Sequence, residues 1–166
     1  MSTLKTTNIQ HPSAASPAVE LTAAGGLWLG GGKVLQIVRA TDTVQRITTS
    51  TSFVDGGISV TITPQKSTSA VILIWSADTS HSSTTNYAIF QITDASNNAV
   101  SGAEGAYVGS NSTTLIEVVT TIIGYATPAT TSATTYKVRF CASSSGTAQI
   151  NNNGPTGQLY AIEVSA

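Results

Sequence analysis

The stretch Thr134-Thr-Tyr-Lys-Val-Arg-Phe-Cys-Ala-Ser143 decides the fold of this chain. Successive side chains of a β-strand point to opposite faces. Tyr136, Val138 and Phe140 therefore share one face of a strand here, and the two basic residues between them share the other. Such an alternation predicts a strand with one face in a hydrophobic core and one face in water.

Similar β-branched, alternating segments recur outward from this strand, with turn residues between them. No stretch after residue 33 has the 3.6-residue apolar period of an amphipathic helix. Residues 33–166 therefore predict an all-β domain, an antiparallel β-sandwich or jelly roll. We expect its strands at Lys33–Ala40, Asp42–Thr49, Ile58–Ile62, Ala70–Asp78, Tyr87–Asp94, Leu115–Tyr125, Thr134–Ser143, Thr147–Asn151 and Gln158–Val164.

One of these segments, Ala70–Asp78, is apolar on both of its faces. This pattern is typical of a central strand that is covered on both sides. The basic residues Lys137 and Arg139, by contrast, predict either a wet surface or an ion-paired contact with a neighbouring copy.

Residues 1–32 differ from the rest, because their few apolar residues are scattered among Ser, Thr, Ala, Pro and Gly. So few apolar side chains do not offset the entropy of ordering the segment alone. We expect an extended leader that docks on another protein, followed by a glycine-rich hinge at Gly25–Gly32. The residues expected to anchor the leader are Leu4, Ile9, Val19 and Leu21, and those expected to pack between subunits are Leu27, Trp28 and Leu29.

Only 9% of the 166 residues are charged and the net charge is −1, against about 25% charged residues in typical domains. This balance argues against nucleic-acid partners and anionic membranes. No apolar run approaches the roughly 20 residues of a membrane span. A weakly charged, Ser/Thr-rich surface suits a protein that packs against copies of itself, and a monomer with a polar surface is the alternative.

The residues that could carry chemistry do not form a convincing site. His11 lies in the leader, and Asp78-Thr-Ser-His81-Ser82 reads as one solvated loop, whereas a catalytic triad converges from separate elements. The only acids within strong strand patterns are Glu117 and Glu163, and they would have to lie together to act as a hydrolase pair. We therefore expect no enzyme, no metal and no cofactor.

Four further motifs have ordinary structural interpretations. Cys141 is expected to be a small buried residue, since no histidine is near it in the sequence. Asp94-Ala-Ser-Asn-Asn98 lacks the ligands of a calcium loop and predicts a hairpin turn. Gly30-Gly-Gly-Lys33 is not a phosphate loop, because a strand follows it. Asn111-Ser-Thr113 matches a glycosylation acceptor only if the chain is secreted from a eukaryote.

Two parts of the chain together resemble a known family. The leader residues Met1–Ser13 and Val19–Gly26 resemble the N-termini of tail-fibre and related appendage proteins of tailed bacteriophages, especially cyanophages. The body resembles the β-rich domain that often follows such a leader. The residues that carry this second resemblance are Gly32–Val38, Ser59–Pro64, Pro128–Val138 and Tyr160–Val164.

The resemblance implies a non-enzymatic virion protein, a homotrimer whose leader attaches it to other virion proteins after assembly in the host cytoplasm. A long fibre carries a repetitive shaft, which this sequence does not contain, so a short fibre, knob or collar piece is expected. The alternatives are a capsid decoration or head fibre, or a tip domain that binds a host receptor or glycan through loops such as Ser80–Tyr87 and Gly102–Thr114.

Overall fold

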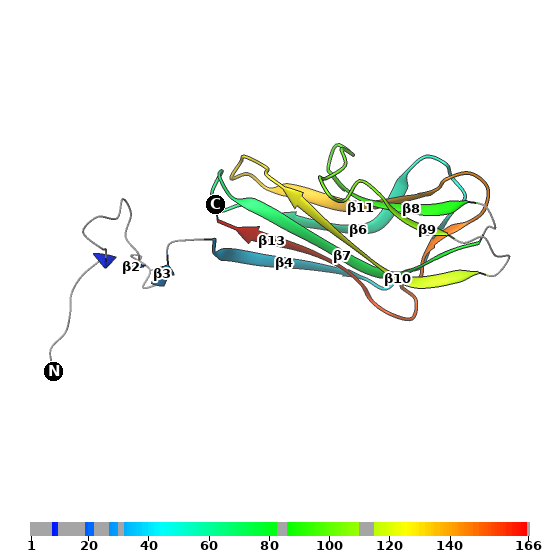
Figure 1. The fold of residues 1–166 in the computed structure, drawn as a ribbon, viewed down its shortest axis with the longest axis horizontal. Helices are drawn as coiled ribbons and strands as arrows, with labels where there is room; N and C mark the ends of the chain where they lie inside the picture. Colours follow the sequence, from blue (N-terminus) through cyan, green and yellow to red (C-terminus); the bar gives the residue numbers. More distant parts are fainter. Residues whose placement is uncertain are drawn as a thin grey trace.

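The computed structural model describes residues 8–9, 19–21, 27–29, 32–82, 86–109 and 115–165. All regular structure in these ranges is β-strand and the strands pair antiparallel (Figure 1). The strands are β1 (Asn8–Ile9), β2 (Val19–Leu21), β3 (Leu27–Leu29), β4 (Val34–Asp42), β5 (Arg46–Thr48), β6 (Val54–Ile62), β7 (Ala70–His81), β8 (Tyr87–Asp94), β9 (Ala106–Gly109), β10 (Ile116–Ala126), β11 (Thr134–Ala142), β12 (Ala148–Ile150) and β13 (Gly157–Val164).

Two sheets form the body of the chain and lie as two layers in Figure 1, as expected for a β-sandwich. The larger sheet has six strands in the order β4-β13-β7-β12-β5, with β10 on the other edge of β7. The smaller sheet has the order β6-β11-β8-β9. A separate three-stranded sheet, β1-β2-β3, lies in the leader.

The core between the two layers contains the residues that the opening stretch predicts. Tyr136, Val138 and Phe140 on β11 are 3%, 0% and 1% exposed, so this prediction is confirmed. The Phe140 ring is parallel to Phe90 on β8 with centroids 6.0 Å apart. Phe90 in turn lies 5.6 Å from Trp75 on β7, so one row of three rings joins the two sheets.

Strand β7 is the centre of the larger sheet. It pairs with β10 along its whole length, from Val71 to His81, and its other edge pairs first with β13 and then with β12. The prediction of a central strand is therefore right, and of the two covered faces expected, the described residues of one chain cover the inner one. Ile72 and Ile74 point away from the core and remain half-buried, because no described layer lies outside the larger sheet.

Several boundaries differ from those expected. The short strand β9 carries no strong pattern, and the expected strand at 42–49 is divided: Asp42 ends β4, and Arg46–Thr48 form β5. Strand β6 starts at Val54, although its Gly56-Gly57 pair looks like a break. Gly57 has φ +78°, and a Cβ there would collide with the Arg46 guanidinium. The glycine therefore allows the irregularity where β6 shifts register against β11.

We expect Phe140→Ala to lower the free energy of unfolding by about 3–5 kcal/mol, because it opens a cavity in the aromatic row. The matched control is the double variant Lys137→Ser/Arg139→Ser on the opposite face of the same strand, which removes two side-chain hydrogen bonds to loop carbonyls and should lower it by about 1–2 kcal/mol. Urea denaturation followed by tryptophan fluorescence measures both. Equal losses in the two variants would contradict the assignment of the core face.

Candidate functional site

The outer face of the larger sheet carries exposed apolar side chains on several of its strands. Register places side chains from four strands in rows that run across it. One row is Ile37, Ile162, Ile72 and Tyr125, and the next is Arg39, Tyr160, Ile74 and Ile123. Val34 and Val164 extend these rows at one end. We call these ten residues the outer apolar face.

Members of the outer apolar face are well exposed at both margins of the sheet. Ile37 on β4 is 61% exposed, and Ile123 and Tyr125 on β10 are 60% and 54% exposed. Four strands at ~4.8 Å spacing and three rows at ~6.7 Å give a face of roughly 19 Å by 20 Å. Roughly 400 Å² is near the size of the largest apolar patch on an ordinary monomer, and such patches are often functional.

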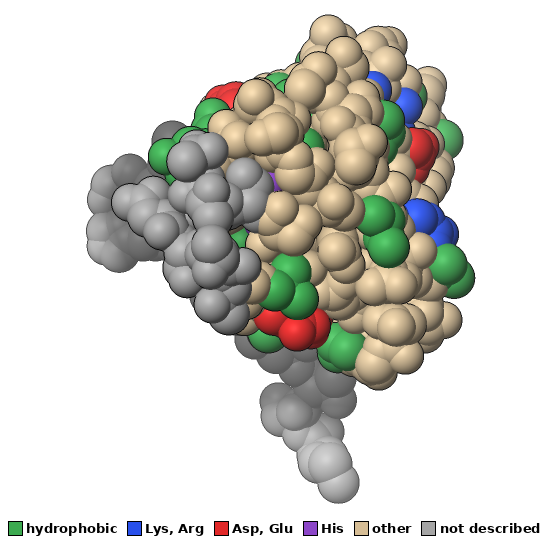
Figure 2. Space-filling model, turned by 90° about the vertical axis from the view of Figure 1, so that its right-hand side faces the viewer, with side chains coloured by type: hydrophobic (Ala, Val, Ile, Leu, Met, Phe, Trp, Pro, Cys, Tyr) green, Lys and Arg blue, Asp and Glu red, His purple; other side chains and the backbone are tan. Residues whose placement is uncertain are grey.

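Charge is sparse on this side of the sheet. The Arg39 guanidinium lies 5.7 Å from the Tyr160 ring centroid and donates to Gln158 Oε1 at 2.8 Å, so it is held flat against the sheet. Acidic groups, Asp78 and Glu117, are found farther along β7 and β10. Figure 2 looks at one end of the molecule instead, where a few blue and red groups lie among mostly tan atoms.

The outer face of the smaller sheet is more polar along β6 and β11, although Tyr87 and Tyr107 are exposed on β8 and β9, where their rings meet edge to face. Lys137 Nζ donates to the Ala95 carbonyl at 3.3 Å, and an Arg139 guanidinium nitrogen donates to the Phe53 carbonyl. Thr61 and Thr135 share a hydroxyl–hydroxyl bond of 2.8 Å. The basic pair therefore binds loops of its own chain, and the β6–β11 part of this outer face is polar.

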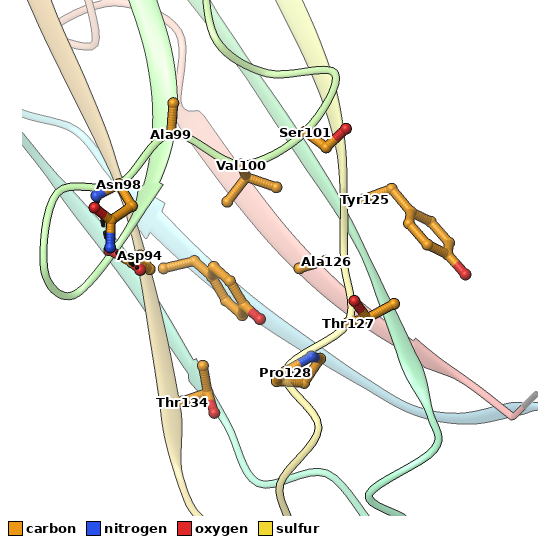
Figure 3. Close-up of a pocket in the computed structure, with 11 residues that line it drawn as sticks. Asp94, Asn98, Ala99, Val100, Ser101, Tyr125, Ala126, Thr127, Pro128 and Thr134 are labelled. Atoms are coloured by element: carbon orange, nitrogen blue, oxygen red, sulfur yellow. Dashed lines mark hydrogen bonds between the residues drawn. The ribbon is translucent and has the colours of Figure 1, made fainter.

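A second candidate site is a pocket of about 360 Å³ at one end of the sandwich (Figure 3). Its walls are the turn from Asp94 to Ser101, the segment from Tyr125 to Pro128, and two β11 residues, Thr134 and Tyr136. In Figure 3 the Tyr125 ring points away from the other labelled residues. The volume is at the small end of the range for ligand pockets, roughly 300–1,000 Å³.

Asp94 and Tyr136 set the chemistry of this pocket. The Asp94 carboxylate accepts the side-chain N–H of Asn98 at 2.8 Å and the backbone N–H groups of Ser96 and Asn98, which lowers its pKa. Burial, and then the Asp94 charge, raise the pKa of Tyr136, so its hydroxyl is a donor at neutral pH. The segment Asp94–Asn98 forms the expected hairpin turn, and the Asp94 carboxylate accepts hydrogen bonds from N–H groups of this turn.

Two pairs of acids, Glu117 with Glu163 and Glu117 with Asp78, can be compared with the carboxyl pair of a glycoside hydrolase. Glu117 lies opposite Ser80 and Glu163 lies opposite Val71, so nine residues of β7, about 30 Å, separate them. Glu117 instead pairs with Asp78. A hydrogen bond with Asp78, followed by the charge of Asp78, raises the pKa of Glu117. Glycosidase carboxyls stand roughly 5–9.5 Å apart, so two acids in direct hydrogen-bond contact do not have that geometry.

His81 lies in a different place from the one expected. It belongs to strand β7 rather than to a loop, so the prediction of one loop at Asp78–Ser82 is wrong. His81 is 2% exposed, and burial lowers its pKa. Because three residues separate it from Asp78 along a strand, the two side chains point to opposite faces. They do not converge.

Cys141 is buried on β11, as expected for a structural residue. Burial raises the pKa of its thiol, although Arg139 opposes this effect. In the leader, Ile9 pairs with Val19, and Leu21 pairs with Leu27. The segment Leu27–Leu29 is therefore a strand within the expected hinge. Leu4, His11, Gly30 and Asn111–Thr113 lie outside the described residues.

Glu163 has a structural role that its strand pattern does not reveal. It is fully buried on β13, where its carboxylate accepts Gln36 Nε2 at 2.6 Å and the backbone N–H groups of Gln65 and Lys66. Burial raises the pKa of this carboxyl, but the hydrogen bonds outweigh burial and hold the pKa below its ordinary value of 4.5. Glu163 thus ties the loop after β6 to the larger sheet.

No protein-family model matches the chain, and no curated protein matches it either. Among the described residues, no group of three or more His, Cys, Asp or Glu side chains is placed to hold a metal ion. Within the same part of the chain, no helix has the length and apolar character needed to cross a membrane.

We expect Glu163 to make stability fall in acid. Since its folded pKa lies below the unfolded value of about 4.5, its contribution is complete above pH 4.5 and disappears as the pH falls through the folded pKa. Glu163→Gln should be less stable than the wild type at pH 7, and the difference should shrink towards pH 3. Urea denaturation at several pH values tests this, and a difference independent of pH would refute it.

Proposed function

We propose that this chain is a non-enzymatic structural subunit of a bacteriophage particle and that it works as a homo-oligomer. The observation that supports the proposal is the outer apolar face, which covers four neighbouring strands of an otherwise Ser/Thr-rich domain. Isolated apolar side chains on a surface need no explanation, whereas a contiguous face of roughly 400 Å² favours a protein partner.

A second copy is the partner that best fits this face. Its few charged groups offer no electrostatic match to a basic or acidic protein, and apolar, charge-poor contacts are typical of interfaces between identical subunits. The sequence resemblance implies three copies per assembly, and the number and spacing of the strands favour a jelly-roll connectivity for the sandwich. The leader, with its Ile9, Val19 and Leu21, would then attach the subunit to other virion proteins of the tail or the capsid.

The test is the state of association of the whole chain, measured by analytical ultracentrifugation. We expect an oligomer at micromolar concentration, and a clean monomer would contradict the proposal. Ile37→Ser/Ile123→Ser should shift the protein towards monomer, because it removes two exposed members of the outer apolar face without opening the core. Its matched control is Tyr107→Ser, which changes a side chain that is 66% exposed on the smaller sheet and should leave the association unchanged.

A receptor- or glycan-binding role is the second candidate, and the pocket at Asp94–Tyr136 favours it. Its wall combines apolar atoms of Val100 and Pro128 with hydroxyls of Ser101, Thr127 and Thr134. Sugars have apolar C–H faces and polar edges, and pockets with a few placed polar groups orient such ligands. No basic side chain lines the pocket, so a neutral sugar fits better than an acidic one.

We expect the wild type to bind a neutral hexose in saturation-transfer NMR, with D-glucose and D-galactose as probes. Tyr136→Phe removes only a hydroxyl and should weaken binding several-fold, as the loss of one hydrogen bond does. Tyr125→Phe is the matched control, because its ring points away from the pocket (Figure 3). Absence of saturation transfer in the wild type would count against this role.

A further inference from the structure

Strand β10 is the edge strand of the larger sheet. Its eleven residues, Ile116–Ala126, pair in unbroken register with β7 on one side. On its other side, the described residues supply main-chain contacts at one end: the Tyr125 N–H donates to the Ser101 carbonyl, and Gly102 lies against the Ile123 carbonyl. Strand β9 lies near β10 but does not pair with it. No described strand pairs with the outer edge of β10 before that point.

The backbone groups that face outward can be identified. In an antiparallel pair, hydrogen-bonded and non-bonded residue pairs alternate. Because the Tyr125 N–H points outward to Ser101, the odd-numbered residues of β10 direct their N–H and C=O groups to the free edge. An independent contact agrees: the Asp78 carbonyl accepts the Asn151 N–H on the far side of β7 and so points away from its partner Val119.

Every other edge of the two sheets is protected in a recognisable way. Strands β5 and β9 have only three and four residues, and β6 has a register shift near Gly57. The loop after β6 contacts the start of β4, where Gln65 Nε2 donates to the Leu35 carbonyl and Gln36 Nε2 donates to the Thr63 carbonyl. Farther along, β4 carries the basic residue Arg39. Short, irregular or covered edges of this kind prevent edge-to-edge pairing.

Among the described residues, strand β10 has none of these protections between Ile116 and Ile122. It is long and regular, it contains no proline and no basic residue, and its one charged residue is Glu117. Its free portion carries the most exposed large apolar side chain of the described residues, Val119, which is 73% exposed, and beside it Val118 and Leu115 are 41% and 49% exposed. A long, flat, apolar edge favours pairing with another strand.

We propose that two copies of this chain join edge to edge through β10, in an antiparallel pair centred on Val119, so that their larger sheets become one continuous sheet. This inference rests on the proposed self-association and specifies which strand makes the contact between copies. The partner edge is another β10 because the remaining edges are protected. A centre at Val119 keeps the second copy clear of Ser101 and Gly102, and it places each Glu117 opposite Thr121 rather than opposite the other Glu117.

The same contact accounts for the size of the outer apolar face. Roughly 400 Å² is only about half of the ~800 Å² that each partner contributes to a standard interface. Edge pairing adds the main chain of β10 and the exposed Val118 and Leu115 to the interface. It also places the outer apolar faces of the two copies side by side across the β10–β10 junction. Because the pairing is two-fold, it favours an even number of copies over the trimer that the sequence resemblance implies.

The decisive variant is Val119→Pro. Proline removes the N–H that would cross the seam, yet the ladder with β7 does not use this N–H, and edge strands tolerate proline at such positions. The pair loses one hydrogen bond from each copy, so we expect the dissociation constant to rise at least about tenfold. The matched control Val119→Thr keeps the N–H and the shape while lowering apolarity, and its dissociation constant should stay within about threefold of the wild type.

Sedimentation of the three proteins separates the outcomes, with circular dichroism checking that each is folded. An oligomer that persists in Val119→Pro, or one that Val119→Thr disrupts as strongly, would overturn the edge pairing but leave the proposed function intact. A monomeric wild type would overturn both.

A measurement on the wild type does not depend on the variants. In hydrogen–deuterium exchange read by NMR, the outward amides of Glu117, Val119 and Thr121 should be protected in the oligomer and exchange quickly on dilution. The amides of Val118 and Thr120, which face β7, should stay protected throughout. Rapid exchange at the three outward amides within an oligomer, including a trimer, would refute the pairing.

Discussion

The row of rings formed by Trp75, Phe90 and Phe140 is the contact on which the rest of the structure depends. These three residues come from β7 of the larger sheet and from β8 and β11 of the smaller one, with centroids 5.6 and 6.0 Å apart. All three are essentially inaccessible to water. Because residues of one strand alternate between faces, fixing these rings inward also fixes which residues of each strand face outward.

That constraint explains why the two outer faces of the sandwich differ. On β11 the inward ring positions leave Lys137 and Arg139 outside, and both bind main-chain carbonyls of their own loops. On β7 the inward Trp75 leaves Ile72 and Ile74 outside, where register aligns them with apolar residues of β13, β4 and β10. The polar face can remain in water, whereas the apolar face gains from a partner.

Much of this arrangement could be predicted from the sequence, because period-two patterns report local geometry. The all-β fold, the buried face of β11 and the central position of β7 all follow from residues close in the chain. The outer apolar face does not, since it joins Ile37, Ile162, Ile72 and Tyr125 through pairings between distant segments. The Asp78–Glu117 contact and the network around Glu163 depend on register in the same way, and no local pattern contains them.

The position of β10 at the edge of its sheet cannot be read from its own residues and depends on the strands around it. Its Val-, Ile- and Thr-rich sequence predicts a strand but not whether that strand is internal. Only the sheet order shows that β10 has one partner, and only the comparison with β4, β5, β6 and β9 shows that the other edges are shortened, bent or covered. Among the described residues, the longest edge strand is the one whose edge stays unpaired over most of its length, and it lies beside an apolar face. This arrangement suits pairing with the same strand of a second copy, which would continue the sheet.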